Sequence, residues 1–208
     1  VVATRNIAEA ARDNHAFLLH LSTDFIFDGT KGPLAEDEKA APLSFYGYSK
    51  LAAEEIVTKM EGLKWAIART VLVYGIAEDM SRTNIILWVK KSLEDKKTIK
   101  VVDDQFRTPT LAEDLAMGCY LIAEKGAEGV FNISGKDFLT PLEMAYKTAD
   151  FFKLDKSFIT KADSTTFTQP AKRPPRTGFI IDKAKSLLGY NPRSFDEGIA
   201  ILAKQIGS

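Results

Sequence analysis

Two short apolar segments on either side of one helical segment constrain the fold more than any other feature of this sequence. Residues 17–27 begin with an apolar run, and residues 65–73 are apolar apart from two positions, so each predicts a buried β-strand. Two strands joined through one helix form a βαβ unit, in which the strands pair in parallel through a right-handed crossover. The sequence therefore predicts an α/β fold containing the second half of a doubly wound parallel sheet. The helix between them begins near Tyr46 and has its apolar positions at Leu51, Ala52, Ile56 and Met60.

Periodicity and helix-start signals predict the remaining elements. Thr140 and Glu143 form a capping box, and Ser194 and Glu197 form a second one before the last helix. Gly62 is expected to end the helix at Tyr46. The other helices are expected over residues 3–14, 85–96, 111–125, 141–152 and 182–189. Further strands are expected over residues 98–102 and 130–134, and the longest irregular segment over residues 160–178.

A threonine, a tyrosine and a lysine form the strongest chemical signal. Thr23 ends the first predicted strand, and Tyr46 and Lys50 are four residues apart, on one face of the helix. A free tyrosine has a pKa of about 10, and a neighbouring lysine cation favours the phenolate. A hydroxyl beside the phenol can hold a carbonyl or alkoxide oxygen. These three groups suit proton transfer coupled to hydride transfer at a carbonyl.

Several motifs then resemble those of a known superfamily. They read STDFIFDG, YGYSK, RTVLVYG and DQFRTPT, with Arg173-Pro174 further on. In this order and spacing, the chain resembles the extended short-chain dehydrogenase/reductase superfamily, and within it the dTDP-4-dehydrorhamnose reductase branch. The resemblance implies a partial Rossmann-type doubly wound sheet plus a small C-terminal α/β substrate domain. Residues 1–75 would belong to the dinucleotide-binding domain, and residues 76–208 mainly to the substrate domain, with some elements returning to the first.

The resemblance also implies what the chain lacks. The glycine-rich turn that holds a dinucleotide pyrophosphate in this superfamily occurs nowhere in the sequence. We therefore expect a fragment without the first half of the nucleotide domain, which by itself binds dinucleotide poorly. The cofactor would be NADPH or NADH, and the residue that chooses between them is absent. The resemblance leaves open whether the protein forms a homodimer.

Residue by residue, the resemblance assigns roles at one site. Tyr46 would be the general acid, Lys50 would hold the nicotinamide ribose, and Thr23 would bond the substrate carbonyl. The positions expected at the cofactor are Leu21, Ser22, Tyr46, Lys50, Thr70 and Val71. The positions expected at the nucleotide-sugar substrate are Thr23, Asp24, Phe25, Leu72, Arg107 and Arg173. A diphosphate could be met by Arg107, Lys172, Arg173 and Arg176, since guanidinium groups match phosphate oxygens. The alternative is that these charges are solvated at the surface.

Two departures leave the substrate and the reaction open. Phe25 stands where the branch usually has tyrosine, and Leu72 stands where it has a tryptophan that packs on the deoxysugar. The leading function is reduction of a nucleotide-linked 4-keto-6-deoxysugar. A sugar-nucleotide epimerase or dehydratase is an alternative, although the dehydratases carry Asp-Glu after the threonine and this chain has Asp24-Phe25. A non-catalytic regulatory subunit, like that of methionine adenosyltransferase, is the other alternative.

Composition excludes several other partners. The formal net charge is zero, which argues against nucleic acid and anionic membranes, and no apolar run approaches the about 20 residues that span a bilayer. His15 and His20 show no metal-ligand spacing, so no metal is expected. The single cysteine, Cys119, is expected to be a buried small hydrophobe, which makes a reducing cytoplasm the default. Arg69, within an apolar strand, predicts a buried ion pair, and Trp88 is expected to be a core or interface aromatic.

Overall fold

The computed structural model describes residues 1–76, 83–166 and 173–207. Its main sheet has three parallel strands in the order β1 (Phe17–Thr23), β2 (Lys64–Thr70) and β6 (Gly129–Asn132). Thr23 lies opposite Thr70, and Arg69 lies opposite Asn132. The carboxyl ends of the three strands therefore meet at one edge of the sheet, where open α/β sheets bind their ligands.

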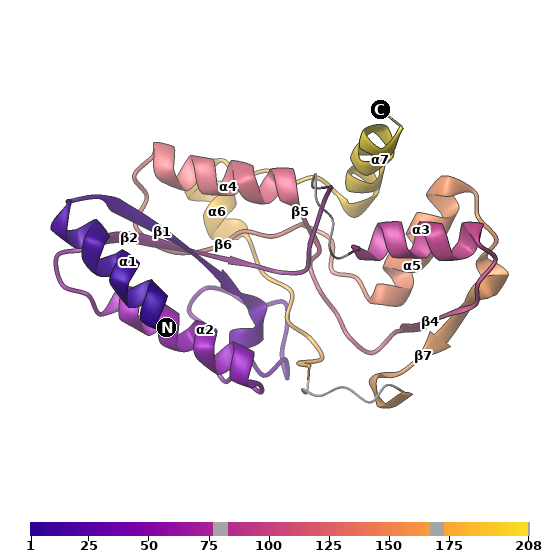
Figure 1. The fold of residues 1–208 in the computed structure, drawn as a ribbon, viewed down its shortest axis with the longest axis horizontal. Coiled ribbons are helices and arrows are strands. Elements are labelled where there is room, and N and C mark those ends of the chain that lie inside the picture. Colours follow the sequence, from indigo (N-terminus) through magenta and orange to yellow (C-terminus); the bar gives the residue numbers. More distant parts are fainter. Residues whose placement is uncertain (77–82, 167–172, 208) are drawn as a thin grey trace.

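Helices cover both faces of this sheet (Figure 1). On one face lie α1 (Val2–Asp13) and α2 (Phe45–Thr58), with a core that includes Ala8, Val57 and Ile67. On the other face lie α4 (Ala112–Glu124) and α6 (Asp182–Leu188), with a core that includes Ile122, Phe131 and Leu188. This arrangement confirms the predicted doubly wound parallel sheet.

The remaining elements form a second group, drawn on the right of Figure 1. Its two small parallel sheets are β3 (Val73–Tyr74) with β5 (Thr110–Leu111), and β4 (Ile99–Val102) with β7 (Ile159–Ala162). Its helices are α3 (Ile85–Glu94), α5 (Pro141–Phe152) and α7 (Phe195–Ile206), with the short 3₁₀ segments η2 (Lys156–Phe158) and η3 (Ser164–Thr166). Both predicted capping boxes are present, at the starts of α5 and α7. The division of the chain at residue 75 stays a prediction, although β6 returns to the first sheet as expected.

The longest helix among the described residues is α2, with 14 residues. Over those same residues, no helix combines the length and the apolar character that crossing a membrane requires.

Several predicted boundaries were wrong. The first strand ends at Thr23, and Asp24–Ile26 form a 3₁₀ turn, η1, because the Thr23 hydroxyl accepts a hydrogen bond from the Phe25 N–H. The second strand ends at Thr70, and Leu72 then adopts a positive φ of 38° that no strand accommodates. The helix α2 ends at Thr58 with Lys59 as its cap, before Gly62. Strand β7 lies partly inside the segment expected to be irregular, of which residues 167–172 fall outside the described part.

The buried charge in β2 has the partner that its position predicts. The Arg69 guanidinium donates to both carboxylate oxygens of Glu54 on α2, at 3.1 and 2.7 Å, and also to the backbone carbonyl of Glu36 at 2.8 Å. The side chains of Arg69 and Glu54 are only 8% and 5% exposed. The predicted structural ion pair is therefore confirmed, and it fastens α2 to the sheet.

Candidate functional site

The start of α2 is held against the turn that follows β1. Ser44 caps the helix by accepting a hydrogen bond from the Gly47 N–H at 3.2 Å. A Cβ added to Gly47 would lie 2.2 Å from the carbonyl oxygen of Phe25. Only glycine allows this close approach of helix and turn. Gly47 therefore sets the distance between the strand that carries Thr23 and the helix that carries Tyr46 and Lys50.

Tyr46 and Lys50 both lie over the carboxyl end of β1. The Lys50 ammonium donates to the Leu21 carbonyl at 2.6 Å, and the Tyr46 ring packs edge-on against Phe25 with 5.8 Å between centroids. Tyr46 is 53% exposed and Leu21 is 46% exposed, so this edge is open. Partial burial lowers the pKa of Lys50, and Glu54 opposes this effect. The structure thus places the phenol and the ammonium on the same side of α2, next to the turn that begins at Thr23.

Replacing Gly47 with alanine is expected to separate the helix from the turn. Alanine favours a helix by about 1 kcal/mol over glycine, yet the clash with Phe25 is expected to lower the free energy of unfolding by about 1–3 kcal/mol. Urea unfolding measures the change. Gly207→Ala is the matched control, because its added Cβ meets nothing closer than 3.6 Å. A Gly47→Ala protein as stable as the parent would show that the close approach is unimportant.

His20 lies on β1 with its imidazole partly buried. Among the described residues its Nε2 has no hydrogen-bond partner, and the charged groups that act on it include Lys50 and Glu54 of α2 and the chain's amino terminus. Burial lowers the pKa of His20, and Lys50 adds to the effect while Glu54 opposes it. The folded state therefore resists protonation of this imidazole more than the unfolded state does.

This difference predicts an acid-sensitive contribution to stability. Above pH about 6.5, both states leave His20 neutral. As the pH falls through that value, the unfolded state takes up the proton first, so stability is lost. We expect the difference in urea midpoint between pH 8 and pH 5.5 to shrink in His20→Gln, which cannot titrate. An unchanged pH dependence in that variant would contradict the prediction.

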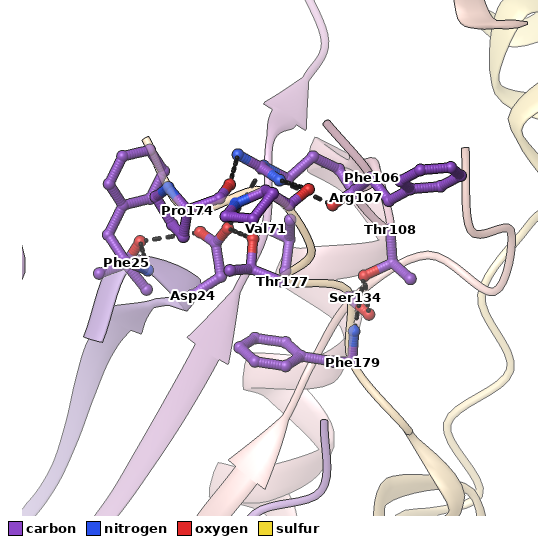
Figure 2. A network of polar contacts seen from close by, with 12 residues as sticks. Asp24, Phe25, Val71, Phe106, Arg107, Thr108, Ser134, Pro174, Thr177 and Phe179 are labelled. Carbon is purple, nitrogen blue, oxygen red and sulfur yellow. Dashed lines mark hydrogen bonds and ion pairs between the residues drawn. The ribbon is translucent and has the colours of Figure 1, made fainter. Parts of the chain in front are cut away.

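A buried polar network lies directly beside Thr23 (Figure 2). Asp24 is 2% exposed, and its carboxylate accepts hydrogen bonds from the hydroxyls of Thr23, at 3.1 Å, and of Thr177. The Arg107 Nε lies 3.6 Å from the same carboxylate. Burial raises the pKa of Asp24, against the opposing effects of Arg107 and the two hydroxyls. Because Asp24 is enclosed in this way, its carboxylate helps to fix Thr23 and is poorly placed to touch a sugar.

The surroundings of Arg107 differ from the predicted diphosphate contact. Arg107 is 5% exposed, and its guanidinium donates to the backbone carbonyls of Phe106, Pro174 and Pro175. With Asp24 beside its Nε, the guanidinium is directed at protein groups. The prediction of a substrate contact came from the residue type alone, which does not distinguish phosphate oxygens from carbonyl oxygens.

Two of the predicted substrate residues line one cavity. Leu72 and Arg173 both face a cavity of about 410 Å³ near the start of α3. Leu72 is 42% exposed and holds the positive φ described above, a strained conformation of the kind that collects at functional sites. The other lining residues are Thr83, Asn84, Ile85, Trp88, Lys100, Val101, Val102, Gln105 and Pro141. Phe25, by contrast, contacts Tyr46 and not this cavity.

Sequence reasoning missed part of this cavity. Trp88 was expected in a core or an interface, but it lines the cavity. Asn84 caps α3 through its side chain, which accepts from the Leu87 N–H at 3.0 Å. The start of this helix at residue 85 was predicted correctly, and an asparagine before an apolar helical repeat is an N-cap signal that could also have identified Asn84. No sequence signal indicated that Trp88 faces the cavity.

The predicted cofactor positions lie at the carboxyl edge of the sheet. Ser22 is 4% exposed, and its hydroxyl has no partner among the described residues. The Thr70 hydroxyl donates to that of Thr110 at 3.3 Å. Val71 is 1% exposed and belongs to the core, with its carbonyl accepting from the Thr110 hydroxyl at 2.7 Å. Its side chain is therefore unavailable, and any cofactor contact of Val71 would involve its backbone.

Comparisons with known proteins show what this chain is similar to in sequence and in fold. A methionine adenosyltransferase 2 subunit beta from Rattus norvegicus is 34% identical over 192 residues, covering 90% of this chain and 57% of that protein. A dTDP-4-dehydrorhamnose reductase from Clostridium acetobutylicum has the same fold, with a TM-score of 0.91 at 26% identity, covering 100% of this chain and 72% of that one. The Bacillus anthracis dTDP-4-dehydrorhamnose reductase, solved in complex with NADP, gives a TM-score of 0.87 at 24% identity, covering 99% and 71% of the two chains. The chain spans about half the length of the curated relatives it matches.

A parallel sheet covered by helices on both faces defines the Rossmann-type α/β class. The sequence model described as "RmlD substrate binding domain" matches residues 1–207. The chain belongs to this family, and the predicted membership of the dTDP-4-dehydrorhamnose reductase-like branch is confirmed.

Proposed function

We propose that the protein containing this chain is an NAD(P)H-dependent reductase of a nucleotide-linked 4-keto-6-deoxysugar. The observation that carries the proposal is the placement of Tyr46 and Lys50 on one side of α2, over the end of β1. The similarity in fold to a dTDP-4-dehydrorhamnose reductase supports it.

The residues at the edge of the sheet fit a nicotinamide cofactor. The Lys50 ammonium has three N–H donors, and the Leu21 carbonyl accepts from one of them. The others could reach the ribose hydroxyls, beside the exposed Leu21 and the unpartnered hydroxyl of Ser22. When bound, the reduced nicotinamide would supply the hydride.

The chain's own side chains would then handle the oxygen of the substrate carbonyl. Thr23, whose hydroxyl is positioned by Asp24, would donate a hydrogen bond to that oxygen. Tyr46 would donate the proton that converts the oxygen into a hydroxyl. The positive charge of Lys50 would stabilise the phenolate that remains after the proton transfer. Leu72 and Arg173, in the cavity beside α3, would hold the sugar and the diphosphate.

A regulatory subunit is the second candidate function. The 34% identity to a methionine adenosyltransferase 2 subunit beta favours it, because the similarity extends over 90% of this chain. In that case, the fold would act as a binding module and the Tyr46 phenol would have no role in turnover.

An absorbance assay separates the two candidates. The full-length protein is mixed with NADPH or NADH and a dTDP-linked 4-keto-6-deoxysugar, and loss of the reduced-nicotinamide absorbance is followed. Turnover supports the reductase. Tight cofactor binding without turnover on dTDP-, UDP- or GDP-linked keto sugars would overturn it and favour the regulatory subunit.

A further inference from the structure

The segment 173–178, which we call the strap, connects the cavity to the network beside Thr23. At its first residue, Arg173 lines the cavity, and four residues later the Thr177 hydroxyl donates to the Asp24 carboxylate. Figure 2 shows Pro174 next to the Arg107 guanidinium and Thr177 next to the Asp24 carboxylate. The strap therefore touches both places where the proposed substrate would be held.

Backbone hydrogen bonds hold the far half of the strap. The Arg176 N–H donates to the Gly29 carbonyl at 3.1 Å, and the Thr177 N–H donates to the Phe106 carbonyl at 3.2 Å. The Arg176 guanidinium also stacks 4.3 Å from the centre of the Phe106 ring. These contacts fix residues 176–177 without help from Arg107.

In the near half of the strap, the Phe106 N–H donates one backbone hydrogen bond to the Pro175 carbonyl at 2.7 Å, and Pro174 has none among the described residues. Pro174 and Pro175 have no N–H, so neighbouring groups can fasten them only through their carbonyl oxygens. Arg107 Nη2 donates to the Pro174 carbonyl at 2.7 Å, and Nη1 donates to the Pro175 carbonyl at 3.2 Å. Pro174 directly follows Arg173 in the chain, so the hydrogen bond to its carbonyl acts on the backbone next to Arg173. A rigid guanidinium fork therefore fixes the backbone next to the cavity arginine.

The charge of Arg107 is compensated inside the protein. Its guanidinium is 3.6 Å from the Asp24 carboxylate, which also accepts from two hydroxyls. A buried cation with a counter-charge and carbonyl acceptors needs no phosphate to satisfy it. Arg173, in contrast, is exposed and lines the cavity.

We propose that Arg107 is a positioning residue, which holds Arg173 at the cavity so that Arg173 can bind the diphosphate of a nucleotide sugar. This inference rests on the proposed function for the identity of the ligand. It deepens that function by naming the group that prepares the diphosphate site. Arg107 would thereby couple the anion site to Asp24 and Thr23 at the other end of the strap.

A double-mutant cycle on nucleoside diphosphate binding tests the proposal. Titration calorimetry with dTDP measures the affinity of the parent, Arg107→Lys, Arg173→Ala and the double variant. Lysine keeps the charge but cannot donate to two carbonyls and pair with Asp24 in one plane. We expect each single change to weaken binding by about tenfold or more, as for loss of one charge-assisted hydrogen bond. The double variant should bind no more weakly than Arg173→Ala alone.

Each other outcome has a distinct meaning. Parent-like affinity in Arg107→Lys, or additive losses in the double variant, would overturn the positioning role and leave the proposed function intact. An Arg173→Ala protein with unchanged affinity would also overturn the positioning role. A parent that binds none of dTDP, UDP and GDP would overturn both the positioning role and the proposed function. Arg69→Lys is the control, because it alters a buried arginine outside the strap and should lower stability without changing affinity. If Arg107→Lys fails to fold, Arg107→Gln, whose amide keeps a single NH2 group in place of the guanidinium fork, takes its place in the cycle.

Discussion

Replacing Tyr46 with phenylalanine is expected to lower kcat/KM for keto-sugar reduction by about 10²–10⁴-fold, the usual contribution of a general acid. The change removes only the phenolic O–H. The ring can keep its edge-on contact with Phe25, and Lys50 can keep its hydrogen bond to Leu21, so the fold and the cofactor contacts should persist. Steady-state kinetics, with the cofactor dissociation constant measured separately, checks the prediction.

Tyr48→Phe is the matched control for this experiment. Tyr48 lies on the same helix and is 60% exposed, close to the 53% of Tyr46, but it has no assigned role at the site. We expect parent-like kinetics in this control. Equal losses in the two variants would mean that aromatic hydroxyls support the helix generally. Parent-like turnover in Tyr46→Phe would show that the phenol is not the proton donor.

Replacing Arg69 with methionine is expected to lower the free energy of unfolding by about 3–5 kcal/mol. The large effect arises because Glu54, 5% exposed, would keep a buried carboxylate without its cation. The Glu36 carbonyl would also lose a donor. Replacing Glu54 by leucine in the same protein should restore most of the stability, because two apolar side chains can fill the space without desolvated charge.

Urea unfolding of the single and double variants measures both effects. Lys59→Met is the control on the same helix, because the pair of Lys59 with Glu55 is solvent-exposed and should contribute at most about 1 kcal/mol. If Arg69→Met costs no more than this control, the buried pair does not fasten α2 to the sheet.

The comparison between sequence and structure separates local from non-local information. The order of strands and helices, the two capping boxes and the Arg69 ion pair were readable from the sequence, because each depends on residues a few positions apart or on one apolar segment. The spacing of Tyr46 and Lys50 likewise fixed their common side, since helix geometry is local. Strand ends were less readable, because the turn at Asp24 depends on a hydrogen bond that the Phe25 N–H donates to the side-chain hydroxyl of Thr23.

The parts that sequence reasoning could not supply join distant segments. Thr177 meets Asp24 across 153 residues, and β7 pairs with β4 in a stretch that had no strand signal. Whether Arg107 faces a phosphate or two proline carbonyls depends on where the strap crosses the 106–108 segment, which the residue type does not encode. By itself, the sequence determined the class of fold and the chemical groups at the end of β1, because periodicity and spacing are properties of neighbouring residues. Only the tertiary structure decided which of these groups are enclosed and which face the cavity, because burial results from the packing of segments that are far apart in the chain.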